Sequence, residues 1–84
     1  MQPQVKAYTL STCSHCKRAK ELLNQLGIKF DYTDVDLLPT AERDKAVEEI
    51  KKVNPPCTFP TLIIGDKVVV GANEPEIRKA LGLT

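Results

Sequence analysis

Residues 12–18 read Thr-Cys-Ser-His-Cys-Lys-Arg, and the rest of the chain is organised around this stretch. Residues 5–10 before it form an apolar run typical of a buried strand, and residues 16–26 after it show the apolar spacing of a helix. Gly27 directly follows the last apolar position of that pattern, where helices commonly end. We therefore predict that Cys13 lies between a strand and the N-terminus of a helix.

This position predicts a reactive thiol. The first backbone N–H groups of a helix have no partner within the helix, and the helix dipole is positive at that end. A thiolate of Cys13 would be stabilised there, which lowers its pKa below the ~8.5 of a free cysteine and makes it a better nucleophile at neutral pH. Cys16 follows one turn later, close enough for a short disulfide loop. Cys13 and Cys16 are thus a candidate redox pair.

A second strand is predicted after the first helix. Residues 28–33 alternate apolar and polar side chains, with Ile28, Phe30 and Tyr32 on one face. A strand, a helix and a strand within about 30 residues form a unit whose two strands run parallel with a right-handed crossover. We expect Phe30 and Tyr32, together with Tyr8 of the first strand, to lie in the core.

The second half of the chain predicts a helix and a hairpin. A helical pattern begins near Thr40, which we expect to cap it, and the Asn-Pro-Pro sequence at residues 54–56 ends it. Residues 61–64 and 67–70 are two apolar segments separated by Gly-Asp, which predicts an antiparallel hairpin with a two-residue turn.

A short third helix is predicted at the C-terminal end of the sequence, capped by Asn73 with Glu76 reaching back to it. The complete order is βαβαββα, an α/β fold with a four-stranded mixed sheet and three helices. Because each helix has one apolar stripe, we expect helices on both faces of the sheet, in a single domain over residues 1–84. Cys13 would then emerge beyond the carboxyl end of the first strand, where open α/β sheets usually place their chemistry.

Composition narrows the possible functions. The chain has 84 residues with 12 basic and 11 acidic side chains, and this net charge of +1 argues against binding nucleic acid or a membrane surface. No apolar run approaches the ~18 residues of a membrane-spanning helix, and residues 1–4 lack the pattern of a signal peptide. We expect a cytoplasmic monomer. In a reducing compartment, its three cysteines indicate catalysis or metal binding rather than a structural disulfide.

Three motifs together resemble the glutaredoxin family of the thioredoxin-like fold, in the same order and over nearly the whole chain. They are the CxxC motif Cys13-Ser14-His15-Cys16, the Thr-x-Pro motif Thr58-Phe59-Pro60, and the late glycine with its polar turn, Gly71-Ala72-Asn73-Glu74. The resemblance implies a thiol–disulfide oxidoreductase that acts in electron transfer and cell redox homeostasis, without a bound cofactor. Its substrates would be protein disulfides or glutathione mixed disulfides.

The resemblance also implies roles for individual residues. Cys13 would be the attacking nucleophile and Cys16 the resolving thiol, with Ser14, His15 and Lys17 tuning the nucleophile. A cis Pro60 would present the backbone of Phe59 to an extended substrate. Thr58 and the turn at residues 71–74 would face glutathione, because backbone N–H groups at a helix N-terminus suit a carboxylate.

The sequence departs from the family pattern at three places. Ser14-His15 replaces the usual Pro-Tyr, Leu10 stands where glutathione-using members carry a lysine, and Glu74 adds a negative charge to the turn. These changes favour thioredoxin reductase over glutathione as the electron donor. The alternative is that Lys17 or Arg18 supplies the cation that is missing at Leu10. Two interpretations of His15 stay open: an imidazolium that lowers the pKa of the Cys13 thiol, or an exposed side chain without that effect.

The competing class is a metal-binding module. Cys13, Cys16, Cys57 and His15 could supply four ligands to zinc or another soft metal, although His15 lies awkwardly between its two cysteines. A weaker alternative, an iron–sulfur cluster bridged between two subunits, is disfavoured by Leu10. For Cys57 itself we expect a small, partly buried residue that fills space before the Thr-x-Pro loop.

Overall fold

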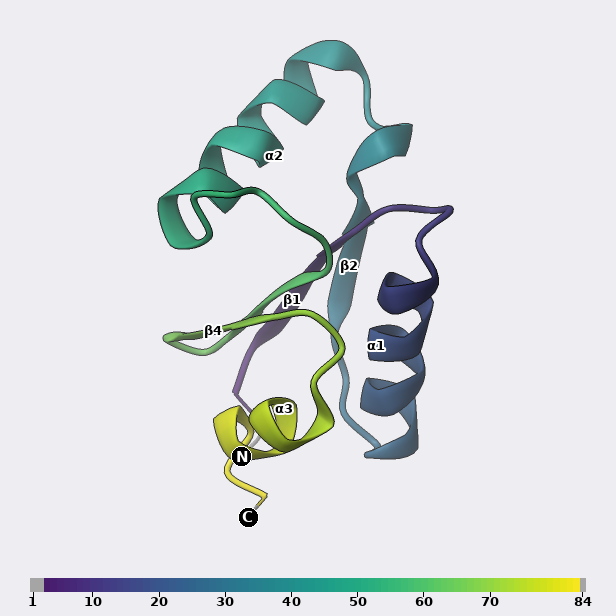
Figure 1. The fold of residues 1–84 in the computed structure, drawn as a ribbon, viewed down its shortest axis with the longest axis vertical. Helices are drawn as coiled ribbons and strands as arrows, with labels where there is room; N and C mark the ends of the chain where they lie inside the picture. The colour runs from purple at the N-terminus through teal and green to yellow at the C-terminus, as the bar shows by residue number, and fades with distance from the viewer. Residues whose placement is uncertain (1–2, 84) are drawn as a thin grey trace.

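The structure, a computed structural model, describes residues 3–83 and shows the predicted order of elements (Figure 1). A short 3₁₀ turn, η1, is added between the second strand and the second helix. The elements are β1 (Val5–Thr9), α1 (Ser14–Gln25), β2 (Asp31–Asp34), η1 (Val35–Leu37), α2 (Thr40–Val53), β3 (Thr61–Ile64), β4 (Lys67–Val70) and α3 (Glu74–Ala80). Within the described residues, no helix is both long and apolar enough to cross a membrane.

The four strands form one mixed sheet in the order β2-β1-β3-β4. β1 runs parallel to β2 and antiparallel to β3, and β3 and β4 form the predicted antiparallel hairpin. In this register Tyr8 lies opposite Thr61, and Thr61 lies opposite Val70. The segments after β1, before β3 and after β4 therefore meet at one end of the sheet, together with the segment after β2.

Helices cover both faces of the sheet, as the apolar stripes predict. α1 and α3 share one face, and the buried cluster there is Val5, Ala7, Ala19, Leu22, Leu23, Leu62, Ile64, Val69, Ile77 and Leu81. α2 covers the opposite face, with a smaller cluster of Tyr8, Val35, Ala46 and Ile50. Burial of apolar surface on both faces holds the sheet between two helical layers and fixes the end at which the loops meet.

The residues that the sequence assigns to turns and helix ends occupy those positions in the structure, with one exception. Gly65 opens the hairpin turn with φ +62°, a conformation that favours glycine. Asn54 ends α2, and Asn73 caps α3 by accepting a hydrogen bond from the backbone N–H of Glu76. The prediction for Thr40 is wrong: Thr40 is the first helical residue, and Pro39 precedes it without a side-chain cap.

The prediction that Tyr32 lies in the core is also wrong. β2 begins only at Asp31 and is an edge strand, and the Tyr32 side chain is 55% exposed. Phe30 precedes the strand and packs, half-buried, against the α1 and α3 cluster. The alternation of residues 28–33 is correct in period, and Tyr32 does lie on the face that α1 covers, below Lys20. Because β2 has a neighbouring strand on one side only, the Tyr32 ring is left partly open to solvent.

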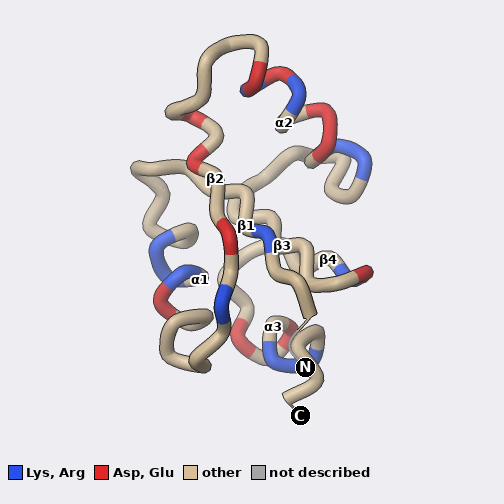
Figure 2. Tube along the Cα trace, turned by 180° about the vertical axis from the view of Figure 1, so that it is seen from behind, with Lys and Arg blue, Asp and Glu red and all other residues tan. Residues whose placement is uncertain are grey.

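Charged side chains are distributed over the surface. Figure 2 shows acidic and basic residues interspersed along α2 rather than gathered by sign. This mixture accompanies the small net charge of +1.

Candidate active site

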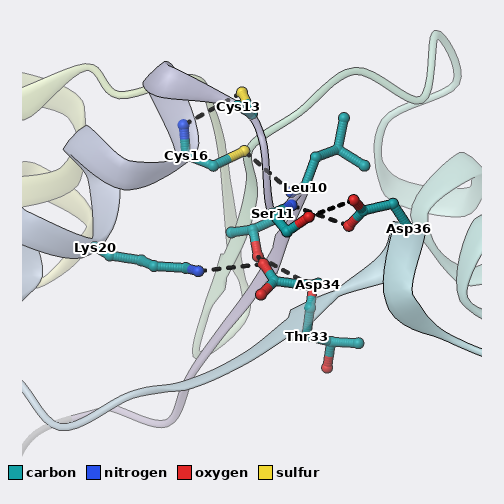
Figure 3. A network of polar contacts seen from close by, with 9 residues as sticks. Leu10, Ser11, Cys13, Cys16, Lys20, Thr33, Asp34 and Asp36 are labelled. Atoms are coloured by element: carbon teal, nitrogen blue, oxygen red, sulfur yellow. Dashed lines mark hydrogen bonds and ion pairs between the residues drawn. The ribbon is translucent and has the colours of Figure 1, made fainter.

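Cys13 is the N-cap residue of α1. Its backbone is extended, with φ −88° and ψ 120°, and its Sγ accepts a hydrogen bond from the backbone N–H of Cys16 at 3.4 Å (Figure 3). The sulfur thus occupies the place of the oxygen in an ordinary N-cap. The helix begins two residues earlier than the apolar pattern suggests, at Ser14, and its first turn contains no acidic side chain.

This geometry lowers the pKa of the Cys13 thiol. The largest cause is the hydrogen bond from the Cys16 side chain, and the backbone N–H groups of Cys16 and His15 add to it, while partial burial opposes it. All three donors stabilise the negatively charged sulfur. His15 therefore acts on Cys13 through its backbone N–H group.

Cys16 has the opposite environment. It is fully buried, and its Sγ accepts a hydrogen bond from the backbone N–H of Leu10 at 3.3 Å. Burial is the main cause that raises the pKa of Cys16 to about 11, and the hydrogen bond to Cys13 raises it further. The two thiols therefore differ in the manner that directional exchange requires: Cys13 is only partly buried and ionises readily, whereas Cys16 is buried and protonated.

The loop that carries Cys13 is anchored by Asp36. The backbone N–H and the hydroxyl of Ser11 donate to the two carboxylate oxygens of Asp36, at 2.9 and 2.5 Å. These hydrogen bonds hold the pKa of Asp36 below its usual value. Arg43 in turn donates to the backbone carbonyl oxygens of Asp36 and Leu38. The sequence carries no local signal of this contact, because Ser11 and Asp36 are 25 residues apart.

A second polar group lies beneath Cys16 in Figure 3. The Thr9 hydroxyl donates to Asp34 at 2.6 Å, and the Lys20 ammonium forms an ion pair with the same carboxylate oxygen at 3.2 Å. The ammonium also lies 3.9 Å from the centre of the Tyr32 ring. The sequence gives one signal that Lys20 belongs to the site: it follows Cys16 by four residues, and this spacing places both side chains on one face of a helix.

The segment before β3 is organised by Asn54, another residue that sequence analysis treated only as a helix stop. Its side-chain amide donates to the Thr58 carbonyl and to the hydroxyls of Thr58 and Thr61, at 3.0 to 3.2 Å. The Thr61 hydroxyl donates back to the Thr58 carbonyl at 2.7 Å. Asn54 is buried, so these bonds tie the end of α2 to the start of β3.

The Phe59–Pro60 peptide bond is cis, as the family resemblance implies. Within residues 3–83, the backbone N–H and C=O of Phe59 form no hydrogen bond, so both are free to pair with another chain. Cys57 has a positive φ of 53° and packs, half-buried, against the α2 cluster. This packing agrees with the expectation that Cys57 fills space.

The turn before α3 is tied to this segment. The backbone N–H of Gly71 donates to the Pro60 carbonyl at 2.9 Å, and Gly71 has φ +90°. The contact places Gly71 and Ala72 beside the Thr-x-Pro segment, while Asn73 and Glu74 are exposed at the start of α3. The structure thus brings two of the three sequence motifs into direct contact.

The residues expected to tune the nucleophile are arranged at the surface. Ser14, His15 and Lys17 are all exposed, and within residues 3–83 the His15 imidazole forms no hydrogen bond or ion pair. The metal alternative finds no support: residues 3–83 contain no group of three or more His, Cys, Asp or Glu side chains arranged to hold a metal ion. Cys57 belongs to the α2 face instead.

The sequence profile of the glutaredoxin family matches residues 5–69. An uncharacterized glutaredoxin-like 8.6 kDa protein from Clostridium pasteurianum is 32% identical over 77 residues, which cover 92% of this chain and 96% of that protein.

Two solved structures from Methanosarcina share the fold closely. The glutaredoxin of Methanosarcina mazei is 49% identical with a TM-score of 0.91, and the match covers 95% of this chain and 79% of that one. Methanoredoxin of Methanosarcina acetivorans is 43% identical with the same TM-score of 0.91, over 95% and 85% of the two chains. With the CxxC pair, the cis-proline segment and the four-stranded sheet in place, the chain belongs to the glutaredoxin family.

Proposed function

We propose that this protein reduces protein disulfides or mixed disulfides by dithiol exchange through Cys13 and Cys16. The observation that carries the proposal is the contrast between the two thiols. Cys13 caps a helix and its pKa is lowered, whereas Cys16 is buried and its pKa is raised to about 11. The attacking thiol and the resolving thiol are thereby distinguished before any substrate binds.

The exchange has two steps. In the first, the Cys13 thiolate attacks one sulfur of a substrate disulfide RS–SR′, a Cys13–S–S–R bond forms, and R′S⁻ leaves and takes a proton from solvent. In the second, Cys16 loses its proton to solvent and attacks Cys13 Sγ. The Cys13–Cys16 disulfide forms and RS⁻ leaves. The substrate gains two electrons, and an external dithiol or two thiols must return them to the protein.

The free backbone of Phe59 supports the docking of an extended substrate. Its N–H and C=O have no partner within residues 3–83, so a strand-like segment beside Cys13 can pair with them. The half-buried Phe59 ring offers an apolar contact at the same place.

For the electron donor, we infer a reductase rather than glutathione. The N-terminus of α3 has little capacity left for a carboxylate: Pro75 lacks an N–H group, and the N–H of Glu76 already donates to Asn73. Glu74 adds a negative charge there, and Leu10 supplies no cation. Such recycling belongs in the cytoplasm, where thiols are kept reduced.

A redox titration of metal-free protein in glutathione buffers, read by mass spectrometry, tests the proposal. We expect a two-electron transition of the Cys13–Cys16 pair within roughly −180 to −280 mV. A pair that stays reduced throughout, or a protein that holds zinc stoichiometrically, contradicts the dithiol function. A glutathione adduct on Cys13 at intermediate potentials contradicts only the inference of a reductase as donor.

A further inference from the structure

Lys20 has an unusual position for a surface lysine. It lies four residues after Cys16 on α1, so both side chains extend from the same face of the helix. Its ammonium is 3.2 Å from Asp34 Oδ1 and 3.9 Å from the centre of the Tyr32 ring, and its side chain is only 22% exposed. An ion pair on one side and an aromatic face on the other hold the charge in one place.

The anion that holds Lys20 is itself fixed from β1. The hydroxyl of Thr9, a fully buried residue, donates to Asp34 Oδ1 at 2.6 Å. The next residue, Leu10, donates its backbone N–H to Cys16 Sγ at 3.3 Å. Two consecutive residues, the last of β1 and the one that follows it, therefore orient the sulfur of Cys16 and, through Asp34, the Lys20 ammonium (Figure 3).

The charged and titratable groups around Cys16 come from three places. They are Cys13 at the N-terminus of α1, Lys20 one turn along the same helix, and Asp34 from β2, which is paired with Lys20. Burial and Cys13 raise the pKa of Cys16, and the positive charge of Lys20 lowers it. Because the effect of burial on the pKa is larger than that of Lys20, the Cys16 thiol is almost entirely protonated at neutral pH. Only the small thiolate fraction can attack, so a group that stabilises this thiolate increases the rate of attack.

We propose that Lys20 is a positioning residue for the resolving step, in which its fixed ammonium stabilises the thiolate of Cys16. The proposal rests on the dithiol function above. It identifies Lys20 as the positive charge that assists the attack of Cys16 on Cys13 Sγ. As Cys16 releases its proton to solvent, the negative charge forms on the face of α1 that carries Lys20. That charge then passes to RS⁻ when the Cys13–Cys16 bond forms. In the reverse direction, the same cation stabilises Cys16 as the leaving thiolate.

The test measures the two steps separately with one equivalent of Ellman's reagent. Attack by Cys13 releases the first nitrothiobenzoate, and attack by Cys16 on the Cys13 adduct releases the second. All variants carry Cys57→Ser, so that only the pair reacts. Lys20→Met removes the charge at similar length, Lys20→Arg retains it, and Lys45→Met removes one charge from an exposed site on α2.

For Lys20→Met we expect a second phase about threefold to tenfold slower at pH 7, since one pKa unit is a tenfold change in thiolate. The pH profile of the second phase should move to higher pH by about half a unit to one unit, while the rate of the first phase stays unchanged. Lys20→Arg and Lys45→Met should keep both phases near the parent rate.

Three results would overturn the proposal. A second phase unchanged in Lys20→Met shows that the cation is irrelevant to resolution. Slowing in Lys20→Met and Lys20→Arg alike, without a shift of the pH profile, indicates altered packing. Absence of the second phase in the parent protein overturns the dithiol function, and the role of Lys20 with it. Circular dichroism and urea unfolding establish that each variant is folded.

Discussion

The N-termini of α1 and α3 are capped in the same way but have different chemistry. In each, the side chain of the cap accepts a hydrogen bond from the N–H three residues on, at 3.4 Å: Cys13 from Cys16, and Asn73 from Glu76. A thiol in this place gains acidity because the N–H groups stabilise its ionised form, whereas an amide gains only a structural role.

The residues around the two caps reinforce this difference. The first turn of α1 has no acidic side chain, while the first turn of α3 carries Glu74, Pro75 and Glu76. At α1 the positive end of the dipole is left for an anionic sulfur. At α3 it is already neutralised by the protein's own carboxylates. The N-terminus of α1 is thus suited to thiol chemistry, and the N-terminus of α3 to stabilising its helix.

The largest effect is expected for Cys13→Ser, which should reduce disulfide exchange to the uncatalysed background, because a serine hydroxyl stays protonated at neutral pH. The measurement is the rate of insulin disulfide reduction with dithiothreitol as donor. Cys57→Ser is the matched control and should retain the parent rate. Substantial activity in Cys13→Ser would mean that Cys13 is not the nucleophile. Loss of activity in Cys57→Ser would indicate that Cys57 has a functional role, as in the alternative metal site.

The second prediction concerns pH. Alkylation requires the thiolate, so the rate rises as the pH passes through the pKa of each thiol. The lowered pKa of Cys13 moves its rise to lower pH, and the rise for Cys16 should be centred near 11. At pH 7.5, iodoacetamide should label Cys13 faster than Cys16 by about a hundredfold or more. Peptide mass spectrometry measures this ratio, and comparable rates would contradict the assignment of roles.

A smaller effect is expected at the other helix end. Asn73→Ala removes the cap of α3 and should lower the free energy of unfolding by about 1 kcal/mol, measured by urea denaturation. Asn73→Asp can still accept the hydrogen bond and should be much closer to the parent protein. Both variants should label at Cys13 at the parent rate. A change in that rate would show that the two helix ends are not independent.

The smallest effect is expected for Glu74→Gln, which removes one negative charge beside the site. The rate with oxidised glutathione, a dianion at neutral pH, should rise by about twofold, because exposed charges interact weakly through water. The rate with the uncharged disulfide of 2-mercaptoethanol should stay unchanged. Equal changes with both substrates would point to a structural effect instead of an electrostatic one.

Sequence reasoning succeeded where the signal is local. The order of the elements, the hairpin turn at Gly65 and the cap at Asn73 are each written in a few neighbouring residues. It failed for Tyr32, because an alternating pattern identifies a strand but not its place in the sheet. β2 lies at an edge, and Tyr32 is exposed there, beneath the Lys20 ammonium.

The contacts that prepare the site join residues that are far apart in the sequence. Ser11 meets Asp36, and Thr9 meets Asp34, across 25 residues of chain. Both pairs depend on the parallel register of β1 and β2, in which Thr9 lies opposite Asp34. No local rule of spacing reveals such partners, because the register is set by how the whole sheet packs between its helices.

The sequence by itself determined the helix end at which a thiol would sit, because a strand, two cysteines and an amphipathic stripe are local features with local consequences. Only the tertiary structure decided how the two thiols differ. Cys16 is buried because α1 packs on the sheet, and its sulfur meets the Leu10 N–H because β1 ends directly below it. Burial and distant polar partners determine the pKa of a thiol, and both come from packing.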